Sequence, residues 1–333
     1  MPFRFLSIKR AVWAPVLVGL FISCCHPVAS FSLVPCIKNQ FTSTSSSLKA
    51  EDESNTNKDS LIRPTASIRV IYESDDVLAV HKPPHISHHD DPKYMGILSC
   101  VRELQKEKEI AYQGRLWGVH RLDRVTSGVL LFAKSQEVAQ ELAESFREKK
   151  VTKYYVALTN KKPKKKKQGW VKGDMMPSRR KSYKLSNTFE NPAITRFFTA
   201  GLGNCDFSGW NCSSAYDSDK IDTNSPNLLP KTMILFHPHT GKTHQLRVAA
   251  KSLGVPILGD LTYSDAAEAK YMERAYLHSL ALHVVIKGEN IAIYNPPNSW
   301  FNEGDDKEGN GLADVLASLM KKHCDCEDLI PLI

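Results

Sequence analysis

The chain has 333 residues, of which 42% are hydrophobic, which is ordinary for a soluble globular protein with one large domain or two small ones. Its eight cysteines are spread along the sequence, which excludes a small scaffold held together by disulfides. The net charge of +8 is uneven, because residues 147–184 hold 15 Lys or Arg and two acids. This basic region indicates a polyanionic partner, although Lys161–Lys167 alone is equally consistent with a solvated lysine loop.

The first 50 residues have the layout of a targeting leader. A basic start precedes an apolar stretch at residues 11–25, which is short for a membrane span and typical of a signal peptide. Residues 31–50 are rich in Ser and Thr and lack acids, as transit peptides do. The junction Ala29-Ser30-Phe31 resembles that of bipartite leaders for complex plastids. We therefore predict a bipartite leader over residues 1–50 that directs import into the plastid stroma, with the mitochondrion and an uncleaved membrane anchor as alternatives.

Beyond a polar linker at residues 51–66, the sequence predicts an α+β fold of short strands and helices. Ser135 is placed to cap a helix that runs to about residue 150, and a second helix over 243–253 should end at Gly254. Residues 201–230 have little apolar content, which predicts an insertion, and residues 301–333 predict a C-terminal tail. The expected strands are residues 67–73, 77–81, 128–133, the segment around Tyr155, 193–199 and 232–236.

The most informative stretch is residues 120–134, HRLDRVTSGVLLFAK, where a charged tetrad and a turn precede a continuous apolar run. The run has the length and β-branched content of a strand covered on both faces, so Asp123 lies in a loop that enters a sheet core. Loops in such positions often carry chemistry. The alternative is a local ion pair between Arg121 and Asp123 at a strand edge.

This stretch resembles the catalytic motif of the RluA family of RNA pseudouridine synthases, and further blocks occur in family order. The blocks are IYESDDVLAVHKPPHIS (71–87), VTKYYVAL (151–158), NPAITRFF (191–198), HTGKTHQLRVAAKSLGVPILGD (239–260) and YLHSLAL (276–282). The resemblance covers roughly residues 67–300, and several ordered blocks are far more specific than one short motif. It implies a single catalytic domain with a large, mostly antiparallel sheet flanked by helices.

The resemblance assigns roles in a reaction that breaks the bond between ribose and uracil nitrogen and rejoins the base through carbon. Asp123 matches the catalytic aspartate, a nucleophile that either adds to the base or traps the ribose. Arg247 matches its paired arginine, and a neighbouring cation favours the ionised carboxylate that attack requires. Tyr155 matches a tyrosine that stacks on the target base and is a proposed proton-transfer group. Tyr154 should point to the opposite face of the strand.

A uridine within structured RNA is out of reach, so such an enzyme must flip the base out of its stack. Arg121 matches the residue that fills the vacated position, and Leu246 is the apolar wall expected beside the base. Lys153, in the strand motif of Tyr155, is a further substrate-binding candidate. His120 either contacts RNA phosphate or holds the loop, and we favour the second role.

We expect neither a metal nor a cofactor, and no glycine-rich phosphate loop is present. Histidines cluster at residues 81–89 and 237–244, but both segments match family blocks that bind no metal. Cys324 and Cys326 follow His323 without a second ligand pair of structural-zinc spacing, so we interpret them as part of an unstructured tail. The predicted partner is RNA, bound by a monomer that makes no stable membrane contact after leader removal.

The RNA target is the least determined prediction, because RNA choice depends on many scattered contacts to a folded shape. We narrowly prefer organellar large-subunit ribosomal RNA over transfer RNA. A non-catalytic RNA-binding or ribosome-assembly factor would have lost Asp123, Tyr155 or Arg247, and all three are present. A sugar-cleaving hydrolase fits less well, because no second matched acid accompanies Asp123.

Overall fold

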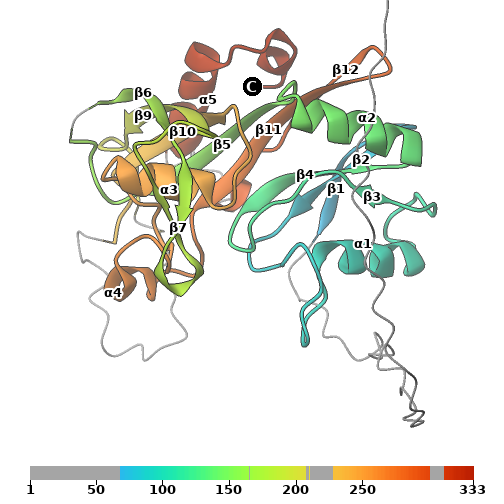
Figure 1. Cartoon of the computed structure of the whole chain (residues 1–333), viewed down its shortest axis with the longest axis horizontal. Coiled ribbons are helices and arrows are strands. Elements are labelled where there is room, and N and C mark those ends of the chain that lie inside the picture. The colour runs from blue at the N-terminus through green and yellow to red at the C-terminus, as the bar shows by residue number, and fades with distance from the viewer. Residues whose placement is uncertain (1–67, 165, 208–209, 211–227, 301–310) are drawn as a thin grey trace, which may run out of the picture. The chain divides into compact units, whose positions relative to one another are not determined.

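The computed structural model describes residues 68–164, 166–207, 210, 228–300 and 311–333, which all belong to a unit spanning residues 57–333. The predicted leader and linker, and most of the predicted insertion, lie outside the described residues. Ten of the described strands form one sheet in the order β1-β2-β4-β11-β5-β10-β9-β6, with β12 beside β11 and β3 beside β4 (Figure 1). Among the described strands only β4 and β11 pair in parallel, so the predicted α+β class with a mostly antiparallel sheet is confirmed.

The elements have the following bounds. The sheet contains β1 (Arg69–Glu73), β2 (Val77–Lys82), β3 (Trp117–Gly118), β4 (Ser127–Ala133), β5 (Thr152–Thr159), β6 (Gln168–Gly173), β9 (Ala193–Gly201), β10 (Thr232–Pro238), β11 (Leu277–Ile286) and β12 (Glu289–Tyr294), and a separate hairpin joins β7 (Met175–Pro177) to β8 (Tyr183–Leu185). The helices are α1 (Ile97–Lys106), α2 (Gln136–Arg147), α3 (Gln245–Ser252), α4 (Ala266–Ala269) and α5 (Leu312–His323), with 3-10 turns at Arg179–Lys181, Asn298–Trp300 and Glu327–Leu332.

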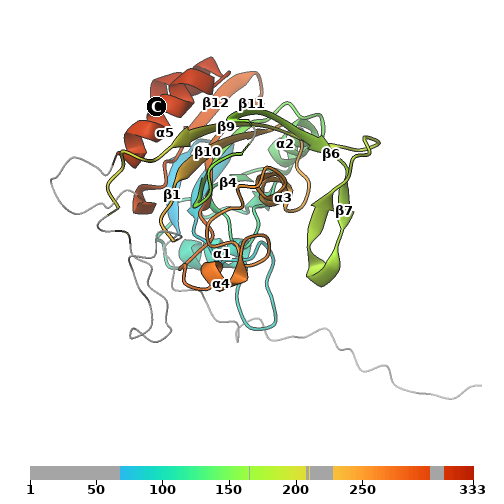
Figure 2. The ribbon, with the colours of Figure 1, turned by 90° about the vertical axis from the view of Figure 1, so that its left-hand side faces the viewer.

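Helices cover both faces of the sheet because its central strands are apolar on both sides. In β4, Leu130 packs in the cluster of α1 while Leu131 packs in that of α2. In β10, Leu235 packs with α5 and Phe236 packs with α3. Figure 2 shows α5 on one side of the sheet and α1 and α4 on the other. Within the described ranges, none of the helices combines the length and hydrophobicity that a bilayer span requires.

The predicted helix boundaries agree with the structure. The Ser135 side chain accepts a hydrogen bond from the backbone N–H of Val138 and so caps α2, and Gly254 follows α3 with a φ of +73°. A second glycine is required inside the sheet. Gly128 has a φ of +109°, and a Cβ there would lie 2.2 Å from the carbonyl oxygen of Ser279 in β11. This close approach joins the start of β4 to β11.

The prediction that residues 301–333 form a tail is wrong for the described residues 311–333. Helix α5 buries Leu312, Leu316 and Met320 against Tyr154 and neighbouring side chains of the sheet. The apolar residues recur at helical spacing, so one stripe of α5 covers the core. The segment around Cys324 and Cys326 is likewise structured, because the backbone N–H of Asp325 donates to the Tyr154 hydroxyl at 2.8 Å.

Candidate active site

Asp123 lies in the loop before β4, at the edge of a cavity of about 390 Å³. The adjacent Leu122 is buried in the α1 cluster, and the backbone N–H of Thr126 donates to the Asp123 carbonyl at 3.0 Å. These contacts fix the loop, while the Asp123 side chain stays 20% exposed. The carboxylate is therefore held in place and still accessible from the cavity.

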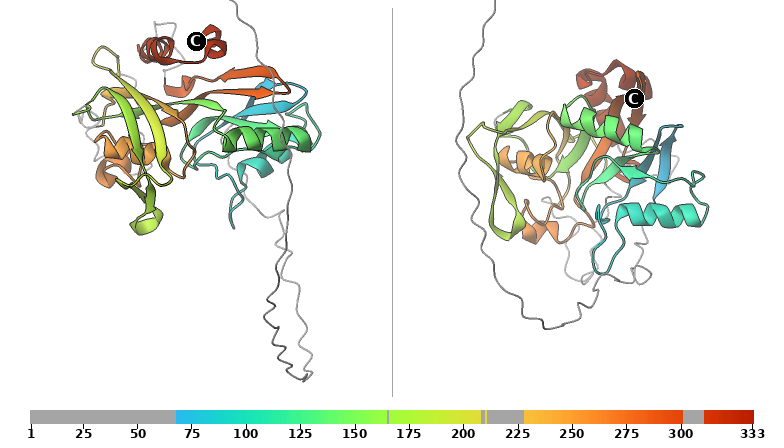
Figure 3. Two further views of the ribbon diagram at one scale, coloured as in Figure 1. Left: turned by 45° about the horizontal axis from the view of Figure 1, so that its top comes forward. Right: turned by 45° about the vertical axis from the view of Figure 1, so that its right-hand side comes forward.

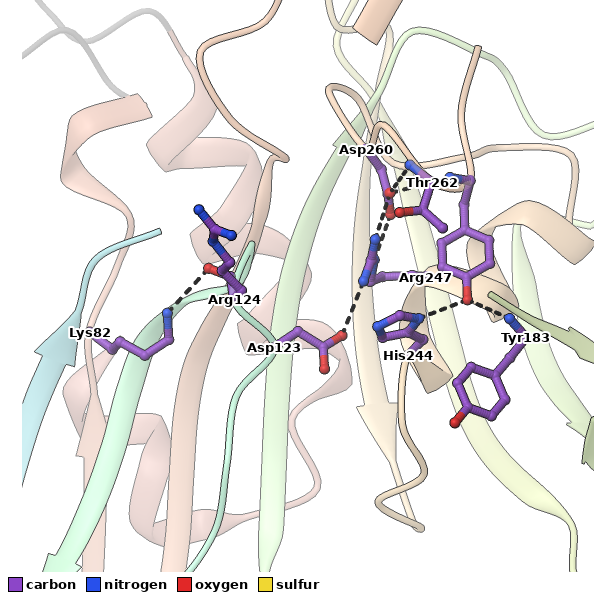
Figure 4. A network of polar contacts seen from close by, with 9 residues as sticks. Lys82, Asp123, Arg124, Tyr183, His244, Arg247, Asp260 and Thr262 are labelled. Carbon is purple, nitrogen blue, oxygen red and sulfur yellow. Dashed lines mark hydrogen bonds and ion pairs between the residues drawn. The ribbon is translucent and has the colours of Figure 1, made fainter. Parts of the chain in front are cut away.

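Arg247, in the first turn of α3, lies between two carboxylates (Figure 4). Its Nη1 is 3.5 Å from Asp123 Oδ2, so the predicted pair is present. Its Nε and Nη2 donate to the two carboxylate oxygens of Asp260 at 2.7 and 2.8 Å, a bidentate arrangement that fixes the guanidinium plane. Burial opposes the charged form, but the hydrogen bonds and charge of Asp260 raise the pKa of Arg247 above its usual value.

Asp260 was missed by the sequence analysis, although it anchors the arginine. Its side chain is fully buried and also accepts from the backbone N–H groups of Thr262 and Tyr263. The available signal was the acid at the end of the apolar run VPILGD, because a buried carboxylate requires a cation or several donors. Beside it, the Tyr263 ring lies 4.9 Å from the Arg247 guanidinium, and its hydroxyl contacts His244 Nδ1 at 2.8 Å.

Tyr155 and Tyr154 point to opposite faces of β5, as predicted. Tyr155 lines the cavity, whereas Tyr154 is fully buried beneath the C-terminal segment. Burial raises the pKa of Tyr155 to about 12, and a hydrogen bond with the Ser279 side chain acts in the opposite direction. The hydroxyl is thus protonated near neutral pH, where it can exchange hydrogen bonds with a substrate but is not a ready base.

The remaining candidate side chains also line the cavity. Arg121 is exposed, Leu246 is 8% exposed, and burial lowers the pKa of the Lys153 ammonium to about 8. His120 accepts a hydrogen bond from the Leu131 backbone N–H at 2.9 Å and stacks on the Phe146 ring. Burial lowers the pKa of His120 to about 3, so the ring is neutral, and this favours the loop-holding role over a phosphate contact.

Lys82 is a second residue that the sequence analysis missed. Its ammonium is buried and donates to the carbonyl oxygens of Pro83, Ile86 and Arg124 at 2.8 to 3.4 Å. The Arg124 carbonyl also accepts from the His85 backbone N–H at 2.7 Å. Burial lowers the pKa of Lys82 to about 7. Lys82 therefore ties the loop at residues 83–86 to Arg124, the residue that directly follows Asp123.

The structure thus brings together all seven side chains that the sequence analysis selected. They come from the loop before β4, from β5 and from the start of α3, and they line one cavity. The candidates are His120, Arg121, Asp123, Lys153, Tyr155, Leu246 and Arg247. The arrangement brings a carboxylate, a fixed cation and a protonated phenol to one cavity.

Comparison with known proteins places the chain in one family. A profile described as RNA pseudouridylate synthase matches residues 76–252. A solved structure titled Human RNA Pseudouridylate Synthase Domain Containing 1 shares the fold, with a TM-score of 0.52, 24% identity and coverage of 71% of this chain and 86% of that one.

Two curated relatives extend the match. The "Uncharacterized RNA pseudouridine synthase" of Haemophilus influenzae is 41% identical over 216 residues, which are 65% of this chain and 81% of the relative. The "Ribosomal large subunit pseudouridine synthase C" of Rickettsia bellii is 31% identical over 236 residues, or 70% and 69% of the two chains. The chain belongs to the RluA-type RNA pseudouridine synthases, isomerases that convert uridine in RNA to pseudouridine.

Proposed function

We propose that the protein isomerises a specific uridine in organellar large-subunit ribosomal RNA, with Asp123 as the nucleophile. The observation that carries the mechanism is the cavity in which Asp123 faces Arg247 and Tyr155. The ribosomal target is supported by the relative named ribosomal large subunit pseudouridine synthase C. Transfer RNA remains the alternative substrate, since the same cavity accepts any flipped uridine.

Asp123 performs the covalent step in this proposal. A carboxylate oxygen adds to the base or traps the ribose as the bond between ribose and uracil nitrogen breaks. The base turns and rejoins the ribose through carbon, the carboxylate leaves, that carbon gives up its proton, and the uracil nitrogen released from the ribose takes one up. No electron donor or acceptor is consumed. Arg247, fixed by Asp260, directs the carboxylate, and Tyr155 offers its ring to the base and its protonated hydroxyl to the proton transfers.

Arg121 and Leu246 complete the recognition of the base. Arg121 is exposed at the cavity edge, two residues from the nucleophile, where its side chain can take the place of the flipped nucleotide. Leu246, adjacent to Arg247 in α3, supplies an apolar wall. Extrusion of the base and its positioning against Asp123 thus use neighbouring residues on two short segments.

Cations around the cavity supply the RNA-binding face. Arg147, Lys149 and Lys242 line the cavity at its outer edge. Further out, Trp170 of β6 is 49% exposed, and its ring carries the Lys172 ammonium at 5.0 Å. Phosphates neutralise such cations and bases stack on exposed aromatic rings. The β7–β8 hairpin, which projects from the sheet in Figure 3, adds exposed charges. They are Arg179, Arg180, Lys181 and Lys184.

The site of action is proposed from the leader alone. Residues 1–50 carry the signal and transit composition described above, which favours the plastid stroma over the mitochondrion. A fusion of residues 1–50 to a fluorescent protein tests this directly. Fluorescence within plastids supports the proposal, and fluorescence confined to mitochondria or the cytosol overturns it.

A site-resolved pseudouridine map of organellar and cytosolic RNA tests the function. The comparison is between cells that carry the native protein and cells that carry Asp123→Ala, with equal protein levels checked by immunoblot. Loss of one modified position in organellar large-subunit RNA is the expected result. Loss of a modified position in transfer RNA would show that transfer RNA, not ribosomal RNA, is the substrate. An unchanged map would contradict catalysis and favour an RNA-binding role. Purified Asp123→Ala should still bind the RNA, because phosphate contacts supply most of the affinity.

A further inference from the structure

A group of three potential metal ligands lies outside the catalytic cavity. His283 of β11 faces Cys326 and Asp328 of the C-terminal segment, and the three ligand atoms all lie within 4.8 Å of one another. His283 is two residues beyond Ala281, so it lies on the α5 side of the sheet, away from the side lined by Tyr155. Figure 3 shows the C-terminal segment beside the hairpin of β11 and β12.

The contact between His283 and Asp328 is not an ordinary hydrogen bond. His283 Nε2 lies 3.0 Å from Asp328 Oδ2, yet this buried nitrogen has no partner in hydrogen-bonding geometry. His283 Nε2 and Asp328 Oδ2 are thus close but not aligned as donor and acceptor. Two ligands that bind the same cation have this geometry. The His283 side chain is 13% exposed, so water has little access to satisfy it.

Cys326 of the C-terminal segment contributes the third potential ligand atom. Burial raises the pKa of the Cys326 thiol above its usual value, while the backbone N–H groups of Leu329 and Asp328 that contact its sulfur act in the opposite direction. Such N–H donors support a thiolate ligand from behind. The residue is 9% exposed, so the sulfur is shielded from most solvent chemistry.

Two neighbouring residues of similar chemistry are occupied elsewhere. Cys324 donates through its thiol to the Cys326 carbonyl at 3.5 Å, and the His323 ring stacks on Phe198 at 3.9 Å. This explains why the sequence pair Cys324 and Cys326 does not itself form the group. The partner of Cys326 comes instead from β11, about 40 residues earlier in the chain.

We propose that His283, Cys326 and Asp328 bind a zinc ion that fastens the C-terminal segment to β11. A nitrogen, a sulfur and a carboxylate oxygen are the ligand types of zinc, and water completes the tetrahedron. Tetrahedral zinc ligands lie about 3.5 Å apart, so a closure of about 1 Å brings the group into range. Asp328, whose side chain is 44% exposed, is free to make that movement.

The position of the group points to a structural role. The C-terminal segment carries the donor that contacts Tyr154, and Asp325 pairs with Arg196 of β9 at 2.7 Å. A zinc ion at its far end would hold this segment over strands β5 and β9 to β12. Binding to the folded state alone raises stability in proportion to the logarithm of zinc concentration. The reaction itself does not require the ion.

Metal titration of the full-length protein tests the proposal without an activity assay. Cobalt(II) is added to reduced protein, and thiolate-to-cobalt charge transfer is recorded together with Tm in the presence of zinc or a chelator. We expect one equivalent of cobalt with a thiolate band, and a Tm that rises with zinc. Cys326→Ser should abolish the band, and Asp328→Asn should raise the dissociation constant by about tenfold or more.

Cys324→Ser is the matched control, because it removes a thiol two residues away that is not in the group. An unchanged band in Cys324→Ser together with its loss in Cys326→Ser supports the site. A band that survives in Cys326→Ser, or that is lost equally in Cys324→Ser, overturns it, as does native protein without any band. Asp328→Asn changes an exposed side chain, so normal folding of this variant with unchanged metal affinity also overturns the proposal.

Discussion

The ion pair between Arg247 and Asp260 determines how firmly the site is held, and Asp260→Asn tests it. The substitution places an amide NH2 against an N–H donor of Arg247, so at least one of the two guanidinium hydrogen bonds is lost. The two side chains are 5% and 0% exposed, so water cannot replace the lost charge. Breaking a buried pair costs about 3–5 kcal/mol, and each kcal/mol corresponds to roughly 2–4 °C in Tm for a domain of this size. We expect Tm to fall by about 10 °C.

The assay is thermal unfolding followed by circular dichroism, with two matched carboxylate-to-amide variants. Asp123→Asn removes the weaker partner, which lies 3.5 Å from Arg247 and is partly exposed, so it should cost less than about 1 kcal/mol. Asp265→Asn alters the exposed cap of α4, where Asn and Asp serve equally well. In single-turnover reactions Asp123→Asn should be inactive and Asp260→Asn slow, because Arg247 loses its fixed direction.

Two results would refute this reasoning. If Asp260→Asn unfolds within about 2 °C of the native protein, the bidentate pair does not stabilise the fold. If Asp123→Asn lowers Tm as much as Asp260→Asn does, Asp123 is the principal partner of Arg247 and Asp260 is an accessory. Either outcome would also remove the explanation given for the slow turnover of Asp260→Asn.

Three further predictions concern other parts of the site. Tyr155→Phe should lower the single-turnover rate by about 100-fold with unchanged RNA affinity, whereas Tyr154→Phe should leave the rate within about twofold; equal effects would exclude a role for the Tyr155 hydroxyl. Folding lowers the pKa of His120 from 6.5 to about 3. Between pH 3 and 6.5 the ring is therefore neutral in the folded protein and takes up a proton when the protein unfolds. The free energy of unfolding should fall as pH drops below 6.5, by up to about 1.4 kcal/mol per pH unit. His120→Gln should flatten that decline in urea unfolding series, and an unchanged slope would contradict it. Gly128→Ala should lower the free energy of unfolding by at least about 3 kcal/mol because its Cβ would meet a β11 carbonyl, whereas Gly201→Ala, with nothing within 4 Å, should be near neutral in the same assay.

The sequence was sufficient to predict the parts of the site that lie within contiguous motifs. Asp123 precedes an apolar strand, Tyr155 sits on another, and Arg247 opens a helix, so local pattern and family resemblance located each of them. Their convergence on one cavity follows from the parallel contact of β4 and β11 at Gly128 and from the pairing of β5 with β11. These pairings join residues more than 100 positions apart, and no periodicity encodes them.

The features that the sequence did not reveal also depend on contacts between residues distant in the chain. In the sequence, Asp260 and Lys82 are an isolated acid and an isolated base at the ends of apolar runs. Their roles depend on partners that folding brings near them. The sequence predicts a tail where helix α5 lies, because a polar stretch separates this segment from the last family block. The helical spacing of its apolar residues was the available signal for a helix. The proximity of Cys326 to His283 likewise cannot be predicted from the sequence, since the two residues belong to different elements.

The double carboxylate environment of Arg247 has a consequence for the course of the reaction. In the mechanism proposed above, Asp123 loses its negative charge when it forms an ester with base or ribose, and a cation paired with it alone would be left buried without compensation. Asp260 takes no part in this proposed covalent step, so its two hydrogen bonds with Arg247 are available in the intermediate as well as in the resting enzyme. The intermediate is thereby spared an electrostatic penalty, and the ground state and the intermediate are kept closer in energy across the catalytic cycle.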